Sequence, residues 1–218
     1  MGILEPIKAE ILAIRLIPNV SPDLAASLNL RPDQKSVGMF TCNIDDVGYT
    51  AIDEATKKAQ VEVVYAKSFY AGAAHASGPL SGEFIGILAG PNPAEVKAGI
   101  QAAQMMIQEE AFFYTANEEG TIAFYAQTIS RTGSYLSTVA GINEGEALAY
   151  LIAPPLESVF GVDAALKAAD VRMAVWFGPP SETNFGGGLL TGSQSACKAA
   201  TEAFRDAVLA VARNPKGF

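Results

Sequence analysis

The sequence has little of what catalytic and metal sites are usually made from. It contains one histidine, His75, and two cysteines, Cys42 and Cys197. No CxxC or HxxH pair is present, so a zinc site has no ligand set. No GxSxG elbow occurs, and one histidine leaves no convincing Ser-His-Asp arrangement. We therefore predict no catalytic residue, no metal and no cofactor, and two buried cysteines without a disulfide framework.

Long apolar runs and an excess of positive charge are also missing. The chain has 15 Lys and Arg against 23 Asp and Glu, a formal net charge of −8. Such a chain has little attraction for nucleic acid or anionic membranes. No run approaches the roughly 18 apolar residues that span a bilayer. Charges at Glu5, Lys8 and Glu10 interrupt the N-terminal segment, which does not resemble a signal peptide. We expect a cytosolic chain with neither nucleic acid nor membrane as partner.

Apolar residues, in contrast, are plentiful. They make up 50% of the 218 residues, and only 17% are charged, so the chain can build a core and is not disordered. The mean hydropathy of +0.21 is high for a soluble monomer. One way to satisfy it is to bury part of the surface against other copies of the chain.

The two halves of the chain resemble each other. "DEATKKAQV" from Asp53 and "DAALKAADV" from Asp163 share five residues at an offset of 110. "ILAGPNPAEVKA" from Ile87 and "LLTGSQSACKAA" from Leu189 agree at an offset of 102. The first copy therefore carries eight extra residues, within the small-residue-rich stretch 68–83, which is typical of a loop. We predict two tandem domains, residues 1–110 and 111–218.

Each half shows the same order of elements: a strand, a short helix, a strand, an amphipathic helix, two strands about a loop, and a final helix. Asn92 is predicted to cap one final helix, and Ser193 or Ser195 the other. This order indicates an α/β (α+β) class with helices packed on small sheets. The predicted ranges are 11–17, 21–28, 37–42, 47–59, 61–66, 84–89 and 93–108 in the first half, and 121–127, 133–139, 147–153, 159–169, 171–177, 187–191 and 195–211 in the second.

Two adjacent acids, Asp45 and Asp46, follow a predicted strand and precede a helix. Helix capping and stabilisation of the helix dipole would explain them without any function. The second copy has Pro155 and Leu156 at these positions, so the fold does not require acids there. This comparison favours a ligand-binding role for at least one of the pair.

Glu83 is the next acid of interest, because it stands between the enlarged loop and a strand. It is either a solvated charge that discourages strand pairing or a second carboxylate that faces a ligand. His75, inside the enlarged loop, is predicted to lie in solvent. The glycine-rich stretch 186–195 resembles a phosphate loop but lacks the lysine that follows the last glycine in such loops. A turn before a helix explains it better.

Five blocks carry a resemblance to a known family: "DEATKKAQVEVVYAKSFYAGAAHASGP", "GPNPAEVKAGI", "SRTGSYLS", "APPLESVFGVDAALKAADV" and "LTGSQSACKAATEAFRDAVL". The chain resembles the L-type shell proteins of bacterial ethanolamine-utilisation microcompartments over its whole length. The resemblance implies two fused, circularly permuted BMC domains, each a small, mostly antiparallel sheet flanked by helices. It also implies a homotrimeric, pseudohexagonal tile that joins other shell proteins in a microcompartment shell within the cytoplasm.

The resemblance further implies a small pore in each subunit and a central channel that opens and closes. Asp45, Glu83 and the segment at Phe112 match the group that binds ethanolamine in the small pore of this family. Carboxylates suit a protonated amine, and acidic rings favour cations in pores. The loop 68–82 would be a gate. A sensor or enzyme on the same fold, and a tile whose pores are incidental, stay open as alternatives.

Overall fold

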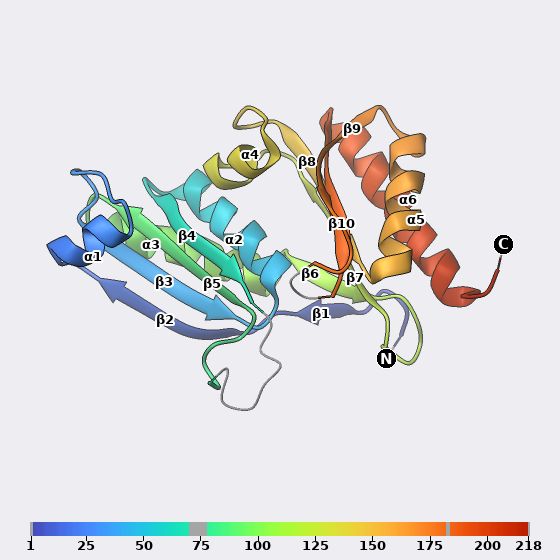
Figure 1. Cartoon of the computed structure of the whole chain (residues 1–218), viewed down its shortest axis with the longest axis horizontal. Coiled ribbons are helices and arrows are strands. Elements are labelled where there is room, and N and C mark those ends of the chain that lie inside the picture. The colour runs from blue at the N-terminus through green and yellow to red at the C-terminus, as the bar shows by residue number, and fades with distance from the viewer. Residues whose placement is uncertain (1, 70–77, 182–183, 218) are drawn as a thin grey trace. The chain divides into compact units, whose positions relative to one another are not determined.

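Residues 2–69, 78–181 and 184–217 are described by the computed structural model of the chain (Figure 1). In this part of the chain, two compact units separate. The first unit comprises residues 8–111 and 133–136, and the second comprises residues 1–7, 112–132 and 137–218. The division into BMC domains at 1–110 and 111–218 stays a prediction.

The first unit is built on a sheet that, in the described residues, has four antiparallel strands in the order β2-β3-β5-β4. Two helices, α2 and α3, pack against each other and against the sheet (Figure 1). Helix α2 lies close to the sheet because it presents a glycine to it: a Cβ on Gly48 of α2 would lie 2.5 Å from the ring of Phe84 on β5. The elements are β2 Ile11–Ile17, α1 Pro22–Ser27, β3 Ser36–Cys42, α2 Asp45–Lys58, β4 Glu62–Ser68, β5 Phe84–Gly90 and α3 Pro93–Glu109.

The second unit carries a sheet whose described strands run in the order β1-β6-β7-β8-β10-β9. Helices α5 and α6 pack together beside this sheet (Figure 1). The sequence did not predict β1 and β6, in which the N-terminal segment pairs with the start of the second half. The elements are β1 Pro6–Lys8, β6 Phe112–Thr115, β7 Ala123–Ile129, α4 Ser134–Ala140, β8 Ala147–Ala153, α5 Pro155–Ala168, β9 Val171–Phe177, β10 Gly186–Gly192 and α6 Gln194–Arg213; α4 begins in the first unit.

The pairing of β1 with β6 depends on contacts that are remote in sequence. The backbone N–H of Leu4 donates to the carbonyl of Thr115 at 2.8 Å, and the N–H of Thr115 donates to the carbonyl of Glu5 at 3.1 Å. The Thr115 hydroxyl also donates to the carbonyl of Gly2 at 2.6 Å. The N-terminal strand therefore belongs to the second unit although it begins the first half of the chain.

The internal repeat is confirmed by backbone geometry. The strand order β2-β3-β5-β4 of the first unit recurs as β7-β8-β10-β9 in the second. After the short helix of each copy, one residue takes a positive φ: Asn29 at 54° and Gly141 at 61°. The next residue in each copy closes the helix with a backbone hydrogen bond. The N–H of Leu30 donates to the carbonyl of Ala25, and the N–H of Ile142 donates to the carbonyl of Ser137. These pairs fix the offset at 112 residues in this region.

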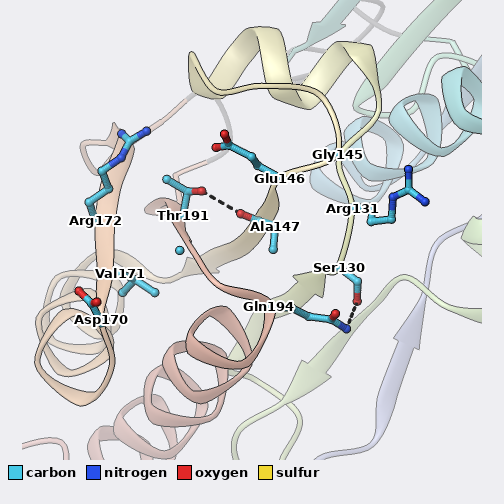
Figure 2. Close-up of a pocket in the computed structure, with 11 residues that line it drawn as sticks. Ser130, Arg131, Gly145, Glu146, Ala147, Asp170, Val171, Arg172, Thr191 and Gln194 are labelled. Atoms are coloured by element: carbon cyan, nitrogen blue, oxygen red, sulfur yellow. Dashed lines mark hydrogen bonds between the residues drawn. The ribbon is translucent and has the colours of Figure 1, made fainter.

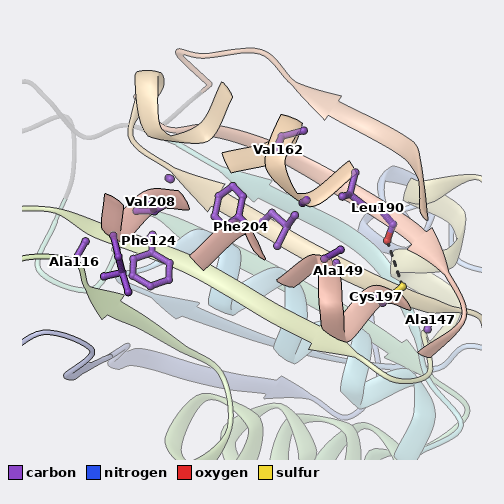
Figure 3. Close-up of a cluster of buried hydrophobic side chains, with 14 residues drawn as sticks. Ala116, Phe124, Ala147, Ala149, Val162, Leu190, Cys197, Phe204 and Val208 are labelled. Carbon is purple, nitrogen blue, oxygen red and sulfur yellow. Dashed lines mark hydrogen bonds between the residues drawn. The ribbon is translucent and has the colours of Figure 1, made fainter. Parts of the chain in front are cut away.

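The core of the second unit lies between its sheet and helices α5 and α6 (Figure 3). Phe124 of β7 and Phe204 of α6 are almost wholly buried there. Gly161 of α5 is needed for this packing, because a Cβ on it would lie 2.7 Å from the Phe204 ring. Cys197 is buried in the same cluster and Cys42 in the first unit, and both are free thiols, as predicted.

The predicted caps are largely confirmed. The Asn92 side chain accepts hydrogen bonds from the N–H groups of Ala94 and Glu95, at the start of α3. Of the two candidates for α6, Ser193 is the cap, because its hydroxyl accepts from the N–H of Ala196 at 3.1 Å. Among the described residues, none of the helices combines the length and apolarity that a bilayer crossing needs.

Candidate functional site

The end of strand β3 places the first predicted acid. The chain turns after Cys42, and the turn is held by Asn43, whose N–H donates to the carbonyl of Glu10 at 3.2 Å. The Asn43 side-chain oxygen in turn accepts from the N–H of Glu10 at 2.7 Å. Helix α2 then begins at Asp45, so the carboxylate stands at the N-terminal end of the helix.

Neither acid of the Asp45–Asp46 pair is the helix cap, and the capping interpretation of these residues is wrong. The N-cap position is Ile44, which has extended backbone and makes no side-chain cap. Asp45 instead accepts a hydrogen bond from the N–H of Asp46 at 3.0 Å. Both acids lie in the first turn, where the helix dipole favours negative charge, and both are only 7% exposed. Helix stabilisation alone does not require two buried acids here.

Glu83 is held beside the same strand end. Its N–H donates to the carbonyl of Cys42 at 2.9 Å, and its carbonyl accepts from the N–H of Phe69 at 3.1 Å. The preceding residue, Gly82, has a φ of +63°, and a Cβ there would lie 2.1 Å from the Cys42 carbonyl oxygen. Only glycine fits this close approach. Burial raises the pKa of the Glu83 carboxyl.

The pKa of the Cys42 thiol is affected by both acids. Its pKa is raised to about 12, first by burial, and further by the negative charges of Asp45 and Glu83, while a hydrogen bond with the backbone of Ile44 lowers it. Asp45 and Glu83, 38 positions apart in the chain, both lie at the end of β3, because Asp45 begins α2 three residues after Cys42 and the N–H of Glu83 donates to the Cys42 carbonyl.

The other predicted positions fall elsewhere. Phe112 is the first residue of β6, is partly buried and belongs to the second unit. His75 lies outside the described residues, and so does most of the loop 68–82 that the resemblance identified as a gate. Among the residues that are described, no group of three or more His, Cys, Asp or Glu is placed to hold a metal ion.

Tyr49 is a neighbour that sequence reasoning passed over. Its hydroxyl oxygen accepts from the N–H of Ser68 at 2.8 Å and bonds to the Ser68 hydroxyl at 3.2 Å. Its ring meets that of Phe84 edge-on, with centroids 4.8 Å apart. Tyr49 thereby ties α2 to the strand that enters the loop and to the strand that follows Glu83. No local signal reveals this role, because the partners are 19 and 35 positions away.

A separate hollow of about 640 Å³ opens at one end of the second unit's sheet (Figure 2). Its polar groups bond to one another: the Thr191 hydroxyl donates to the Ala147 carbonyl at 2.9 Å, and the Gln194 amide donates to the Ser130 hydroxyl at 3.0 Å. Charges of both signs line it, and none of the predicted site residues does. It offers no defined ligand chemistry.

The glycine-rich stretch before this hollow is not a phosphate loop. Gly187 lies within strand β10, and a Cβ on it would lie 1.8 Å from the carbonyl oxygen of Leu151 on β8. The glycines therefore serve close contact between strands, and Gly192 ends the strand before the Ser193 cap. These glycines, which the sequence pattern assigned to a turn before a helix, lie instead in the strand that leads into the helix.

Comparison with known proteins agrees with this architecture. The BMC domain family matches residues 36–117. The bacterial microcompartment shell protein EutL of Clostridium perfringens is 60% identical over 212 residues, which is 97% of this chain and 98% of that protein. The crystal structure of ethanolamine utilization protein EutL from Leptotrichia buccalis superposes with a TM-score of 0.96 at 60% identity, covering 100% of both chains.

A more distant structure shares the fold. A trimeric bacterial microcompartment shell protein PduB superposes with a TM-score of 0.73 at 21% identity, over 94% of this chain and 89% of that one. The full-length similarity at 60% identity decides the assignment. The chain therefore belongs to the EutL family of bacterial microcompartment shell proteins and is a structural component of the ethanolamine-utilisation shell, not an enzyme.

Proposed function

We propose that the chain forms homotrimeric tiles that join other shell proteins and whose small pores bind ethanolamine through Asp45, Glu83 and the segment at Phe112. Binding at these pores would regulate the passage of small molecules through the shell. The observation that supports the proposal is the backbone geometry at the end of β3: the N–H of Glu83 donates to the carbonyl of Cys42 at 2.9 Å, and Asp45 begins helix α2 three residues after Cys42.

Two carboxylates at one strand end suit a small ammonium ion. At neutral pH ethanolamine carries one positive charge and three N–H donors, and charge-assisted hydrogen bonds to carboxylates are stronger than neutral ones. Asp45 is only 7% exposed, so an ammonium bound there competes with little water. A hydroxyl at the other end of the ligand needs only a backbone acceptor, which is the role proposed for the segment at Phe112.

The second copy of the repeat supports a special role for the acids. Its counterparts of Asp45 and Asp46 are Pro155 and Leu156, the first two residues of helix α5. A helix therefore starts there without a carboxylate at either of these two positions. The trimeric state is supported by the shared fold with trimeric PduB and by the high mean hydropathy of the chain.

Titration calorimetry with ethanolamine tests the site. We expect Asp45→Asn and Glu83→Gln each to weaken binding at least tenfold, because each removes one charged acceptor while the side chain keeps its size. Asp46→Asn is the matched control: it removes the adjacent charge and should retain binding. Unchanged affinity in both Asp45→Asn and Glu83→Gln would remove the two acids from the proposal. Equal permeability of shells built with wild-type and variant tiles would instead support incidental pores.

A further inference from the structure

Tyr49 joins the two elements that place the candidate acids. It follows Asp45 by one turn of helix α2, so the two side chains lie on the same side of the helix. Its hydroxyl oxygen accepts from the N–H of Ser68 at 2.8 Å and donates to the Ser68 hydroxyl at 3.2 Å. Ser68 ends β4 and pairs with Phe84, the residue after Glu83. Tyr49 therefore connects the helix of one acid to the strand end that carries the other.

The backbone of Glu83 depends on the same strand end. The N–H of Phe69, the residue after Ser68, donates to the carbonyl of Glu83 at 3.1 Å. The ring of Tyr49 meets that of Phe84 edge-on, with centroids 4.8 Å apart. Because Phe69 follows Ser68 directly, a strand end that is released from Tyr49 also loosens the hydrogen bond to Glu83.

The ring of Tyr49 also stacks on that of Tyr135, which comes from the second sequence repeat. The ring centroids are 6.0 Å apart and the planes are 8° from parallel, an arrangement that aromatic pairs favour. Tyr135 is fixed by its neighbours in the chain. The N–H groups of Gly133 and Leu136 each donate to the Asp53 carboxylate at 2.8 Å. This segment belongs to the same compact unit as α2, so the stack is part of that unit.

The second copy of the repeat has neither the acids nor this connection. Helices α2 and α5 align at an offset of 110, so the counterpart of Tyr49 is Val159, which is 49% exposed. The counterpart of Ser68 at the same offset is Gly178, which has no hydroxyl to bond. The helix and strands of this fold therefore assemble without the tyrosine, as they do without Asp45. The connection and the acids occur together in one copy.

We infer that Tyr49 is a positioning residue of the ethanolamine site: it fixes the separation between the Asp45 and Glu83 carboxylates, and Tyr135 holds its ring in place. The inference rests on the proposed function and adds two residues that act through the acids. A ligand as short as ethanolamine needs both carboxylates within reach of one ammonium group, so a site held at this separation costs less to order on binding. Such a site favours ethanolamine over a longer amino alcohol.

Titration calorimetry with ethanolamine and with 3-aminopropan-1-ol, which is one methylene longer, tests the inference. Tyr49→Phe removes the hydroxyl and keeps the ring. We expect it to weaken ethanolamine binding about fivefold, the order of one neutral hydrogen bond, and to change the affinity for the longer amino alcohol less than about twofold. The preference for ethanolamine should thus fall. A role in stability alone would leave the ratio of the two affinities unchanged.

Tyr65→Phe is the matched control. It removes a tyrosine hydroxyl from the same strand, β4, at a residue that is 44% exposed. Both affinities should stay as in the wild type, because Tyr65 is not part of the connection between the acids. An equal loss of preference in Tyr65→Phe and Tyr49→Phe would overturn the inference.

Two variants of Tyr135 test the stacked ring. Tyr135→Phe keeps the ring on Tyr49 and should bind both amino alcohols as the wild type does. Tyr135→Ala removes the ring and should reduce the preference for ethanolamine, as Tyr49→Phe does. Wild-type binding in Tyr135→Ala would remove this residue from the inference. If Tyr135→Ala does not fold, Tyr49→Phe, which keeps both rings, still tests the connection.

Hydrogen exchange gives a readout that needs no ligand. The N–H of Ser68 is protected by its bond to Tyr49, so it should exchange faster in Tyr49→Phe. Mass spectrometry of a peptide that covers residues 62–69 measures this change, and a peptide that covers strand β3 should keep its exchange rate. Equal exchange of the first peptide in wild type and variant would show that Tyr49 does not hold the end of β4.

The outcomes separate this inference from the proposed function. If Asp45→Asn and Glu83→Gln weaken binding while Tyr49→Phe leaves the preference for ethanolamine unchanged, the function stands and the positioning role is overturned. If the wild type does not bind ethanolamine, or if both acid variants bind it unchanged, the proposed function falls and the inference falls with it. Loss of preference in Tyr49→Phe and not in Tyr65→Phe supports both. Cooperative thermal unfolding of each variant establishes that the substituted chains are folded.

Discussion

The backbone N–H of Leu136 donates a 2.8 Å hydrogen bond to the carboxylate of Asp53, 83 positions earlier in the chain. The same carboxylate accepts from Gly133, and its charge is balanced by Lys57, whose ammonium lies 3.8 Å away. Asp53 thus does from a distance what an N-cap side chain does locally. Burial raises the pKa of Asp53, while these two hydrogen bonds and Lys57 lower it.

Loss of this carboxylate should destabilise the fold. Asp53→Asn replaces one carboxylate oxygen by an NH₂ group, so one backbone N–H that bonds to this oxygen in the wild type loses its acceptor. Leaving a buried donor unpaired costs about 1–3 kcal/mol. Urea unfolding of the variant measures the loss. Asp206→Asn, at an exposed side chain paired with Arg205, is the control and should change the free energy of unfolding by less than about 0.5 kcal/mol. Equal stability of the two variants would contradict the importance of the Asp53 contact.

Glycine at position 82 should be needed for the candidate site. Gly82 and Gly141 have similar positive φ values, 63° and 61°, but a Cβ on Gly141 meets nothing within 4 Å. Gly141→Ala should therefore cost only the left-handed backbone penalty of about 1–2 kcal/mol. Gly82→Ala should cost more, because its Cβ also meets the Cys42 carbonyl. Thermal unfolding compares the two variants, and a smaller loss of stability in Gly82→Ala than in Gly141→Ala would contradict this prediction.

Ethanolamine binding should weaken on acidification at a pH above the ordinary range for glutamate. Burial raises the pKa of Glu83 above 4.5, and only the ionised form attracts an ammonium ion. Affinity measured by calorimetry between pH 4 and 8 should fall as Glu83 takes up its proton. A profile that stays flat down to pH 4.5 would argue against Glu83 as a ligand.

The raised pKa of Glu83 also predicts the direction in which the stability of the fold changes with pH. A carboxyl whose pKa is higher in the folded state binds more protons folded than unfolded, so its contribution to stability decreases as pH rises through the interval from 4.5 up to the folded pKa. Glu83→Gln should remove this dependence. The difference in free energy of unfolding between wild type and variant should thus grow in the variant's favour as pH rises, and the opposite slope would show that the pKa is not raised.

Both thiols should resist modification in the folded chain. Cys42 and Cys197 are buried, and burial raises the pKa of each, that of Cys42 to about 12, so little reactive thiolate exists at pH 8. Dithiobis(nitrobenzoate) should titrate no thiol within minutes in buffer and two in guanidinium. Rapid reaction of one thiol in buffer would place that cysteine outside the core.

Truncation of a large side chain in the core of the second unit should be costly. Phe204 is fully buried between α6 and the sheet, and Gly161 packs against its ring. Phe204→Ala should lower the free energy of unfolding by about 3–5 kcal/mol. Met105→Ala, at an exposed side chain, should cost less than about 0.5 kcal/mol. Similar denaturant midpoints for the two variants would show that the Phe204 cluster contributes little.

Much of the local structure was predictable. Strand β8 is a continuous apolar run and is buried at every position, and α2 carries apolar residues at helical spacing with Lys57 and Lys58 in its last turn. The Asn92 cap was recognisable because the side chain and the N–H groups it accepts from are two and three residues apart. These features depend on neighbours within one turn or one strand, so the local pattern contains them.

The candidate site was less predictable. The family resemblance named Asp45 and Glu83, but composition and spacing left each with a structural explanation. The pattern of two aspartates before a helix suggested that one of them caps the helix. In the structure neither acid caps the helix that starts at Asp45. Phe112 stays a prediction, and so does the part played by Asp46.

The sequence by itself determined the class of elements and the tandem repeat, because periodicity and internal similarity are properties of the chain. Only the tertiary structure decided that Glu83 stands beside Cys42 and that Asp53 holds Leu136. These contacts join residues 41 and 83 positions apart, and their geometry depends on how strands pair and helices pack. An acid that is buried and an acid in solvent look the same in a sequence; Asp53 and Asp163 occupy matching places in the repeat and differ only in what covers them.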